Sequence, residues 1–222
     1  MDTKSVITTD RLYWLGRYTA RVYTTLKMFE VSFDKLIEAD NREYAEFCDQ
    51  LEIPNIYKDK DDFIARYAFD QEDPNSIMSN LMRAYDNAIE LREEIGSESL
   101  AYIQLSVYSI QKAKVSSAPF LELQKVMDDI LAFWGIVDDQ TDDKTTRNII
   151  KVGKRIERVD LYARVRTHDE ALRREMSRLI PRLKESGLKY SEEKLEHLIK
   201  LCDAQVLDHH QIVNEIESLT EV

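Results

Sequence analysis

Acidic and basic side chains follow one another at helical spacing near the middle of the second half of the chain. Gly153, Glu157, Asp160 and Arg164 are separated by steps of four, three and four, which places them on one face of a helix. If this face turns inward, its charges have to be paired or hydrogen-bonded. The two carboxylates could then serve as general acid and base beside an arginine that holds a carboxylate substrate. The alternative is a solvated face with ordinary salt bridges.

Two arginines near the start of the chain are the expected partners of these carboxylates. Arg17 directly follows Gly16 in the stretch LYWLGRY, and Arg21 comes one helical turn later. A glycine inside a helix costs about 1 kcal/mol relative to alanine. Gly16 therefore needs a structural reason.

Metal and nucleotide chemistry are not indicated. A di-iron helical bundle needs Glu-x-x-His pairs, and the sequence contains none. Glu193 and His197 are four residues apart without further ligands, and the adjacent His209 and His210 point in different directions on a helix. No glycine-rich loop is available to hold phosphates. We expect no metal, no cofactor and no ATP binding by this chain alone.

The composition predicts a globular protein of the cytoplasm. The net charge of −11 over 222 residues argues against a nucleic-acid partner, which needs a clustered basic surface. Cys48 and Cys202 are too few for a disulfide framework and are interpreted as small packing residues. No stretch approaches the roughly 20 apolar residues of a membrane span, and the start lacks the apolar core of a signal peptide.

The spacing of apolar residues predicts an all-α protein, a helical bundle of about seven to nine helices within one domain over residues 1–222. Five glycines and four prolines leave little material for the turns of a many-stranded sheet. The helices could form one bundle or two closely packed bundles. The expected helices cover residues 8–37 with Thr8 or Thr9 as cap, 42–51, 61–68, Asp73-Pro74 to Gly96, 97–114, a segment from Pro119, Thr145 or Thr146 to Arg166, and segments from near His168 and Ser191.

An internal repeat relates the first long helix to the one near 145–166. Residues 8–22 (TTDRLYWLGRYTARV) align without a gap on residues 145–159 (TTRNIIKVGKRIERV), so that Gly16 falls on Gly153. Two related helices that carry a glycine in phase suggest a close crossing near a pseudo-twofold axis. The alternative is that each glycine only accommodates a large neighbour such as Trp14 or Trp134.

These segments resemble the bacterial alpha-E family. Residues 12–22 and 152–160 (VGKRIERVD) are similar to the two copies of its LGRYLERAE-type motif, and residues 73–105 resemble its middle motif. The resemblance implies an all-helical fold and genomic association with circularly permuted ATP-grasp ligases and transglutaminase-like peptidases. That association suggests amide-bond formation on a peptide or small metabolite.

The candidate ligand cluster combines the charged stripe with the motif positions. The chain departs from the family pattern at Ala20 and Ala101, where glutamates are usual, and at Tyr85 and Ile89, where arginines are usual. If those positions form a ligand site, this chain has lost part of it. The candidate residues are Arg17, Arg21, Asn87, Arg92, Glu98, Glu157, Arg158 and Asp160.

The leading functional hypothesis is a helical subunit, not catalytic on its own, that acts with an ATP-grasp amidoligase. It would hold a peptide or a small carboxylate ligand or complete the site of its partner, and a transglutaminase-like protein is a further expected partner. One alternative is a stand-alone enzyme that uses Glu157 and Asp160 with Arg158, Arg92 or Arg21. Another is a scaffold that forms a homo-oligomer. The substrate is not indicated.

Overall fold

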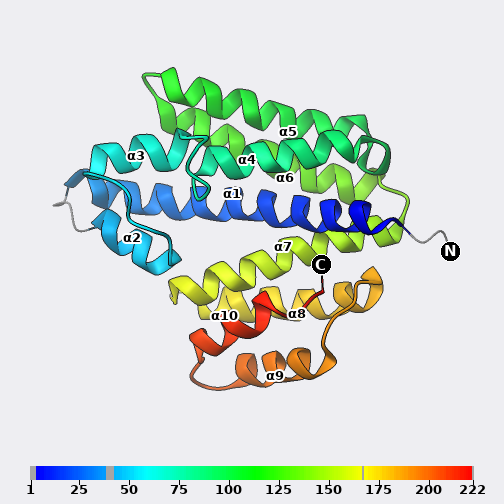
Figure 1. Cartoon of the computed structure of the whole chain (residues 1–222). Helices are drawn as coiled ribbons and strands as arrows, with labels where there is room; N and C mark the ends of the chain where they lie inside the picture. Colours follow the sequence, from blue (N-terminus) through cyan, green and yellow to red (C-terminus); the bar gives the residue numbers. More distant parts are fainter. Residues whose placement is uncertain (1–3, 39–42, 167, 222) are drawn as a thin grey trace. The chain divides into compact units, whose positions relative to one another are not determined.

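The chain folds into α-helices throughout the part that the structure describes. The computed structural model describes residues 4–38, 43–166 and 168–221, with the side chains of 32–38 excepted. This part contains ten α-helices, no strand and one isolated bridge between Tyr190 and Thr220. The helices are α1 (Val6–Glu38), α2 (Glu43–Leu51), α3 (Lys60–Phe69), α4 (Ile77–Glu90), α5 (Arg92–Val115), α6 (Pro119–Gln140), α7 (Lys144–Val165), α8 (Asp169–Ser186), α9 (Glu192–Asp203) and α10 (His209–Glu217) (Figure 1).

The predicted all-α class is confirmed, and the helix count is one above the expected range. The tenth helix is α10, which follows the two helices expected from near His168 and Ser191. The boundary expected at Gly96 between two helices lies instead at Leu91, between α4 and α5. Gly96, with φ of 81°, interrupts the helical conformation where a helix end was expected, but this interruption lies inside α5. No helix among the described residues is both long enough and apolar enough to cross a bilayer.

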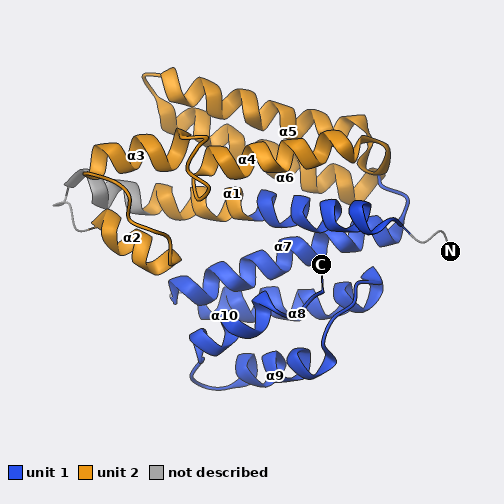
Figure 2. Cartoon of the chain, in the orientation of Figure 1, with its two compact units in different colours: residues 1–20, 141–222 blue, residues 21–140 orange. Residues whose placement is uncertain are grey.

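The chain divides into two compact units, and the division falls within α1. Unit 1 comprises residues 1–20 and 141–222, and unit 2 comprises residues 21–140 (Figure 2). The single domain expected over 1–222 stays a prediction.

Unit 1 is built around α7. This helix packs against α8 and α10, and α9 packs against α8 and α10 in turn. α7 begins after Asp143, whose carboxylate accepts hydrogen bonds from the backbone N–H groups of Thr145 and Thr146. The predicted cap at Thr145 or Thr146 is therefore wrong. The aspartate just before them satisfies the free N–H groups first.

The start of α1 also differs from the prediction. The helix begins at Val6, and the Ser5 hydroxyl accepts a hydrogen bond from the backbone N–H of Thr8 at 3.0 Å. Ser5 therefore acts as the cap in place of Thr8 or Thr9. Of the other expected bounds, the start of the 42–51 helix at Arg42 lies outside the described residues.

Unit 2 shows a third displaced helix start. Ser76 caps α4 by accepting a hydrogen bond from the backbone N–H of Ser79, so the start expected at Asp73-Pro74 is wrong by about one turn. Asp73 is instead buried and accepts a hydrogen bond of 2.6 Å from the hydroxyl of Tyr57. Its other carboxylate oxygen accepts a hydrogen bond of 2.9 Å from the backbone N–H of Asn75, in the turn that precedes the helix.

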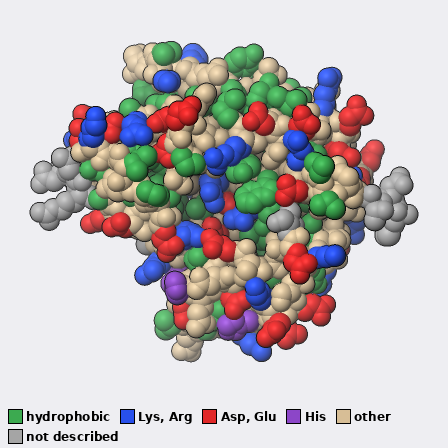
Figure 3. All heavy atoms as spheres, viewed as in Figure 1, with side chains coloured by type: hydrophobic (Ala, Val, Ile, Leu, Met, Phe, Trp, Pro, Cys, Tyr) green, Lys and Arg blue, Asp and Glu red, His purple; other side chains and the backbone are tan. Residues whose placement is uncertain are grey.

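The core of unit 2 contains an aromatic cluster. Phe29, Phe47, Phe63 and Tyr67 contact one another at centroid distances between 5.2 and 6.5 Å. Cys48 is buried beside Phe47 on α2, in agreement with its expected packing role. On the face shown in Figure 3, acidic and basic side chains are interspersed among smaller apolar areas.

Candidate functional site

The candidate site of unit 1 is organised by the crossing of α1 and α7. A Cβ atom on Gly16 would clash with the carbonyl oxygen of Ile150 and lie 3.0 Å from the backbone nitrogen of Lys154. A Cβ atom on Gly153 would clash with the carbonyl oxygen of Tyr13 and lie 3.1 Å from the backbone nitrogen of Arg17. The backbones of the two helices therefore touch at both glycines.

The contacts at the two glycines are related by the internal repeat. The alignment that places Gly16 on Gly153 also places Tyr13 on Ile150 and Arg17 on Lys154. Each glycine thus meets the repeat counterparts of the residues that the other glycine meets. This reciprocity is what a pseudo-twofold axis through the crossing requires. The predicted symmetric crossing is confirmed, and it explains why α1 carries a glycine within a helix.

The crossing brings Arg17 against the acidic stripe of α7. Arg17 Nε donates to Glu157 Oε2 at 2.6 Å, and a second guanidinium nitrogen lies 4.0 Å from Asp160 Oδ2. Glu157 and Asp160 are 0% and 2% exposed and Arg17 is 8% exposed. The stripe therefore turns inward, and the solvated alternative is wrong for these two carboxylates.

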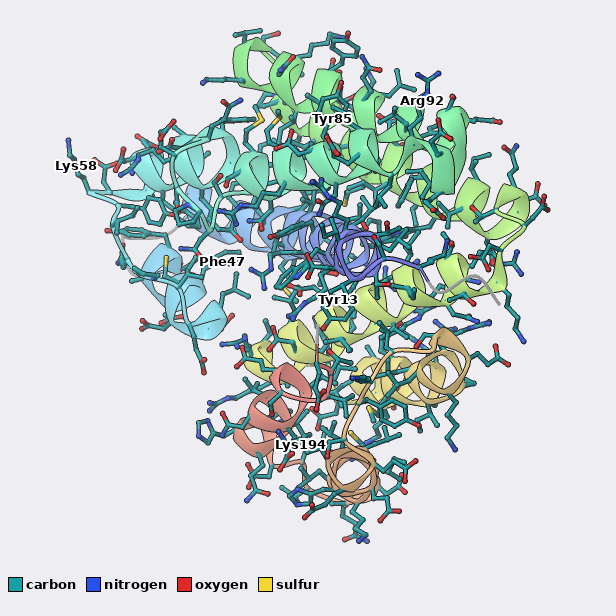
Figure 4. All side chains as sticks on the ribbon, turned by 45° about the vertical axis from the view of Figure 1, so that its right-hand side comes forward. Tyr13, Phe47, Lys58, Tyr85, Arg92 and Lys194 are labelled. Carbon is teal, nitrogen blue, oxygen red and sulfur yellow. The ribbon has the colours of Figure 1, made fainter. Side chains whose placement is uncertain are left out.

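Aromatic rings complete the surroundings of Arg17. Its guanidinium carbon lies 5.1 Å from the centroid of Trp14 and 5.9 Å from that of Tyr13, within the range of cation–π attraction. Burial by itself would lower the pKa of Arg17, but the charge of Glu157, followed by smaller effects of Tyr13 and Asp160, raises it above its ordinary value. Arg17 is therefore a permanent cation. Tyr13, labelled on α1 in Figure 4, accepts a hydrogen bond from the hydroxyl of Thr220 at 3.1 Å.

The network continues along α7 to α10. Arg164 Nε donates to Asp160 Oδ1 at 2.9 Å, and the same guanidinium contacts Glu217. Glu157, Arg17, Asp160, Arg164 and Glu217, in that order, thus form one chain of alternating charges across three helices. In this chain both candidate carboxylates are neutralised by arginines.

The pseudo-twofold symmetry relates the backbones of α1 and α7, but the charged side chains of the two helices do not follow it. The repeat counterpart of Arg17 is Lys154, and the counterpart of Glu157 is Ala20. One buried ion pair therefore stands where a fully symmetric crossing would have two. Ala20 is 0% exposed, so an apolar contact occupies the position of the second acid.

A further buried acid, Glu175, was not found from the sequence. Glu175 on α8 is 2% exposed and lies within ion-pair distance of Arg155, Arg158 and Arg178. Its oxygens are 3.4 Å from Arg158 and 3.5 Å from Arg178. The available signal was its place beside Leu172 and other members of the apolar stripe of α8, where an acid is unusual.

The remaining candidate residues lie outside the contacts described for the Arg17–Glu157 pair. Arg158, expected in the same cluster as Glu157, contacts Glu175. Arg92 is exposed on α5 and donates to the Ser97 hydroxyl at 3.0 Å (Figure 4), and Glu98 is exposed on the same helix. Arg21 and Asn87 are half-buried in unit 2. A ligand role for these residues stays a prediction.

Two of the four histidines each lie beside one acid. His197 Nδ1 lies 3.0 Å from Glu215, and His209 lies 3.4 Å from Asp169. Among the described residues no three His, Cys, Asp or Glu side chains are grouped closely enough to hold a metal ion.

The fold and site define a class of helical protein in which two related long helices cross at paired glycines and bury an Arg–Glu pair. A family model described as a predicted alpha-helical domain with a conserved ER motif matches residues 8–218. The chain therefore belongs to the Alpha-E family. Its one Glu-Arg dipeptide is Glu157-Arg158. Glu157 pairs with Arg17, and Arg158 pairs with Glu175. No curated protein and no solved structure matches the chain.

Proposed function

We propose that this Alpha-E protein is a helical subunit that works with an ATP-grasp amidoligase in forming amide bonds on a peptide or small metabolite. Membership of the Alpha-E family supports the proposal, because the family resemblance implies genomic association with ATP-grasp ligases. The role of the subunit would be to hold the substrate or to complete the site of the ligase. A transglutaminase-like protein is the second expected partner.

The burial of Glu157 and Asp160 favours an accessory role over a stand-alone enzyme. A general acid or base has to come within hydrogen-bond reach of its substrate. Glu157 and Asp160 are buried, and both are hydrogen-bonded to arginines of the same network. Their geometry is that of groups that fix the α1–α7 crossing. This supports a protein whose contribution to the reaction lies in binding.

Co-purification of the two proteins tests the proposal. The tagged chain would be expressed with each ATP-grasp ligase encoded in the same genome, and complexes would be measured by size-exclusion chromatography with light scattering. We expect a stable complex with one of these ligases and none with an unrelated ATP-grasp enzyme, which serves as control. A chain that binds none of them and forms a homo-oligomer instead would support the scaffold alternative.

A further inference from the structure

The outward sides of α5 and α6 carry apolar side chains in positions where a solvent-facing helix is usually polar. Leu105 and Tyr108 on α5 are 47% and 59% exposed, and Leu131 on α6 is 47% exposed. The opposite side of α5 is apolar as well, since Ile103 and Ile110 are buried in the core. Helices that are apolar on all sides are typically covered on all sides. The outward side of this helix pair is therefore suited to contact with another protein.

The two helices lie side by side and run antiparallel within unit 2 (Figures 1 and 2). The Ser109 hydroxyl donates to Asp129 Oδ2 at 3.2 Å, and Lys112 Nζ lies 2.8 Å from Glu122 Oε1. These two contacts fix the register of the pair, so the level of each outward residue of α5 along α6 is known.

The exposed charges of α5 are arranged about Leu105, which the register places level with Leu131 of α6. Glu98 and Lys112 each lie seven residues, or two helical turns, from Leu105, so the three side chains share one side of the helix. All three are exposed. The outward side of α5 therefore has an acid toward its start, a leucine in the middle and a cation toward its end.

Helix α6 repeats this spacing in the opposite direction. Lys125 and Asp139 are exposed, and each lies seven residues from Ala132. Because the helices are antiparallel, Lys125 lies toward the same end of the pair as Lys112, and Asp139 toward the same end as Glu98. The outward side of the pair thus has two lysines at one end and two acids at the other.

The charges at these two ends are not neutralised within the chain. Lys112 and Lys125 share the carboxylate of Glu122, at 2.8 and 2.9 Å, which leaves one positive charge in excess. In the part of the chain that the structure describes, Glu98 and Asp139 have no ion-pair partner. The two ends are therefore complementary to each other in sign, so this surface is complementary to a reversed copy of itself.

The size of the surface also fits a dimer. One exposed acid, Asp128, lies between the two ends and accepts a hydrogen bond from Gln124 at 2.9 Å. Each helix is about 30 Å long and contributes a width of about 10 Å, so the pair offers roughly 600 Å² from each copy. Specific interfaces start at a total of about 1,200 Å², which two such surfaces supply.

We propose that the outward side of α5 and α6 binds the same surface of a second copy of this chain. A twofold axis that crosses the two helices at the level of Leu105 reverses the ends of the pair. Lys112 then lies opposite Glu98 of the partner subunit, and Lys125 lies opposite Asp139 of the partner subunit. Leu105 meets its own counterpart in the apolar middle. The contact involves unit 2 only and does not depend on the ligase partnership.

Sedimentation velocity of the full chain over a dilution series measures the dimer. We expect a reversible dimer at micromolar concentrations. Leu105→Glu should raise its dissociation constant about a hundredfold, because two buried leucines are lost and two carboxylates meet at the axis. Val206→Glu, the same kind of change at an 85% exposed apolar residue of unit 1, should leave the dissociation constant unchanged. A chain that is monomeric throughout the series, or equal effects of the two variants, would overturn the proposal.

Charge reversal tests the orientation of the two copies. Lys112→Glu should weaken the dimer about tenfold, since it turns two attractions into two repulsions, and the addition of Glu98→Lys should restore the affinity. Lys114→Glu makes the same change on another side of α5 and should have little effect. Circular dichroism melts check that each variant is folded. A double variant that dimerises as weakly as Lys112→Glu alone would contradict the twofold arrangement.

Discussion

The ion pair between Arg17 and Glu157 is shielded from water, because both side chains lie in the contact between α1 and α7. A buried pair of this kind is a weak source of net stability, but the removal of one partner leaves a charge that water cannot reach. The pair therefore acts mainly as a constraint on how the two helices meet.

We expect Glu157→Gln to lower the free energy of unfolding by about 3 kcal/mol, because Arg17 loses its buried counter-ion. Urea denaturation followed by circular dichroism measures this change. The matched control is Glu185→Gln, which alters an exposed pair with Lys144 and should have a much smaller effect. Similar losses in the two variants would show that burial of Glu157 has no energetic consequence.

Lys154 gives the protein a pH dependence of defined sign. Folding lowers the pKa of its amine from 10.5 to about 6, so between these values the unfolded chain holds a proton that the folded chain has lost. Stability from this group therefore increases as the pH rises through the window, by at most about 1.4 kcal/mol per pH unit. The slope of unfolding free energy between pH 7 and 9 should be smaller in Lys154→Met than in the natural chain. Equal slopes would show that Lys154 remains a cation in the fold.

At the scale of elements, Gly16 and Gly153 set the distance between α1 and α7. We expect Gly16→Ala and Gly153→Ala each to destabilise unit 1 by about 1 to 3 kcal/mol, since the added carbon meets backbone atoms that cannot move aside. Thermal melts measure both changes.

Gly135 provides the control for these substitutions. It lies inside α6, is exposed, and has nothing within 4 Å of the place where a Cβ would stand. Gly135→Ala should therefore raise stability by up to about 1 kcal/mol through helix propensity alone. If all three alanine variants were stabilised alike, the close crossing would be contradicted.

The elements also show which features the sequence could predict. The glycines at equivalent positions of the repeat indicated the crossing, because a position with no room for a side chain requires glycine. The inward turn of Glu157 and Asp160 could not be decided, since steps of three and four also describe a solvated face. The helix starts at Ser5, Ser76 and Asp143 were displaced because several residues able to cap lie close together at each site.

Long-range partners were the least predictable part of the site. Arg17 and Arg21 are one turn apart on α1, and only the direction of the crossing selects Arg17 as the partner of Glu157. The Glu175 cluster joins residues of two successive helices, so no local spacing revealed it. Charge patterns along one helix predict pairs within that helix and say little about pairs between helices.

At the scale of the whole molecule, the chain comprises two compact units that share α1. The buried networks described here lie in unit 1, whereas Asn87, Arg92 and Glu98 of the middle motif lie in unit 2. In unit 1 the buried acids Glu157, Asp160 and Glu175 are committed to arginines, which supports the proposed binding role. Activation of a carboxylate with ATP also requires groups that stabilise charge on phosphate, which we expect the ligase to supply.

The most direct test is an assay of ATP hydrolysis and amide formation with the purified chain, alone and together with the proposed ATP-grasp partner. Candidate carboxylate and amine substrates would be supplied in both cases, and mass spectrometry would detect the product. We predict no ATP turnover by the chain alone, and amide formation by the complex that exceeds that of the ligase alone. ATP-dependent amide formation by the chain without any ligase would contradict the account.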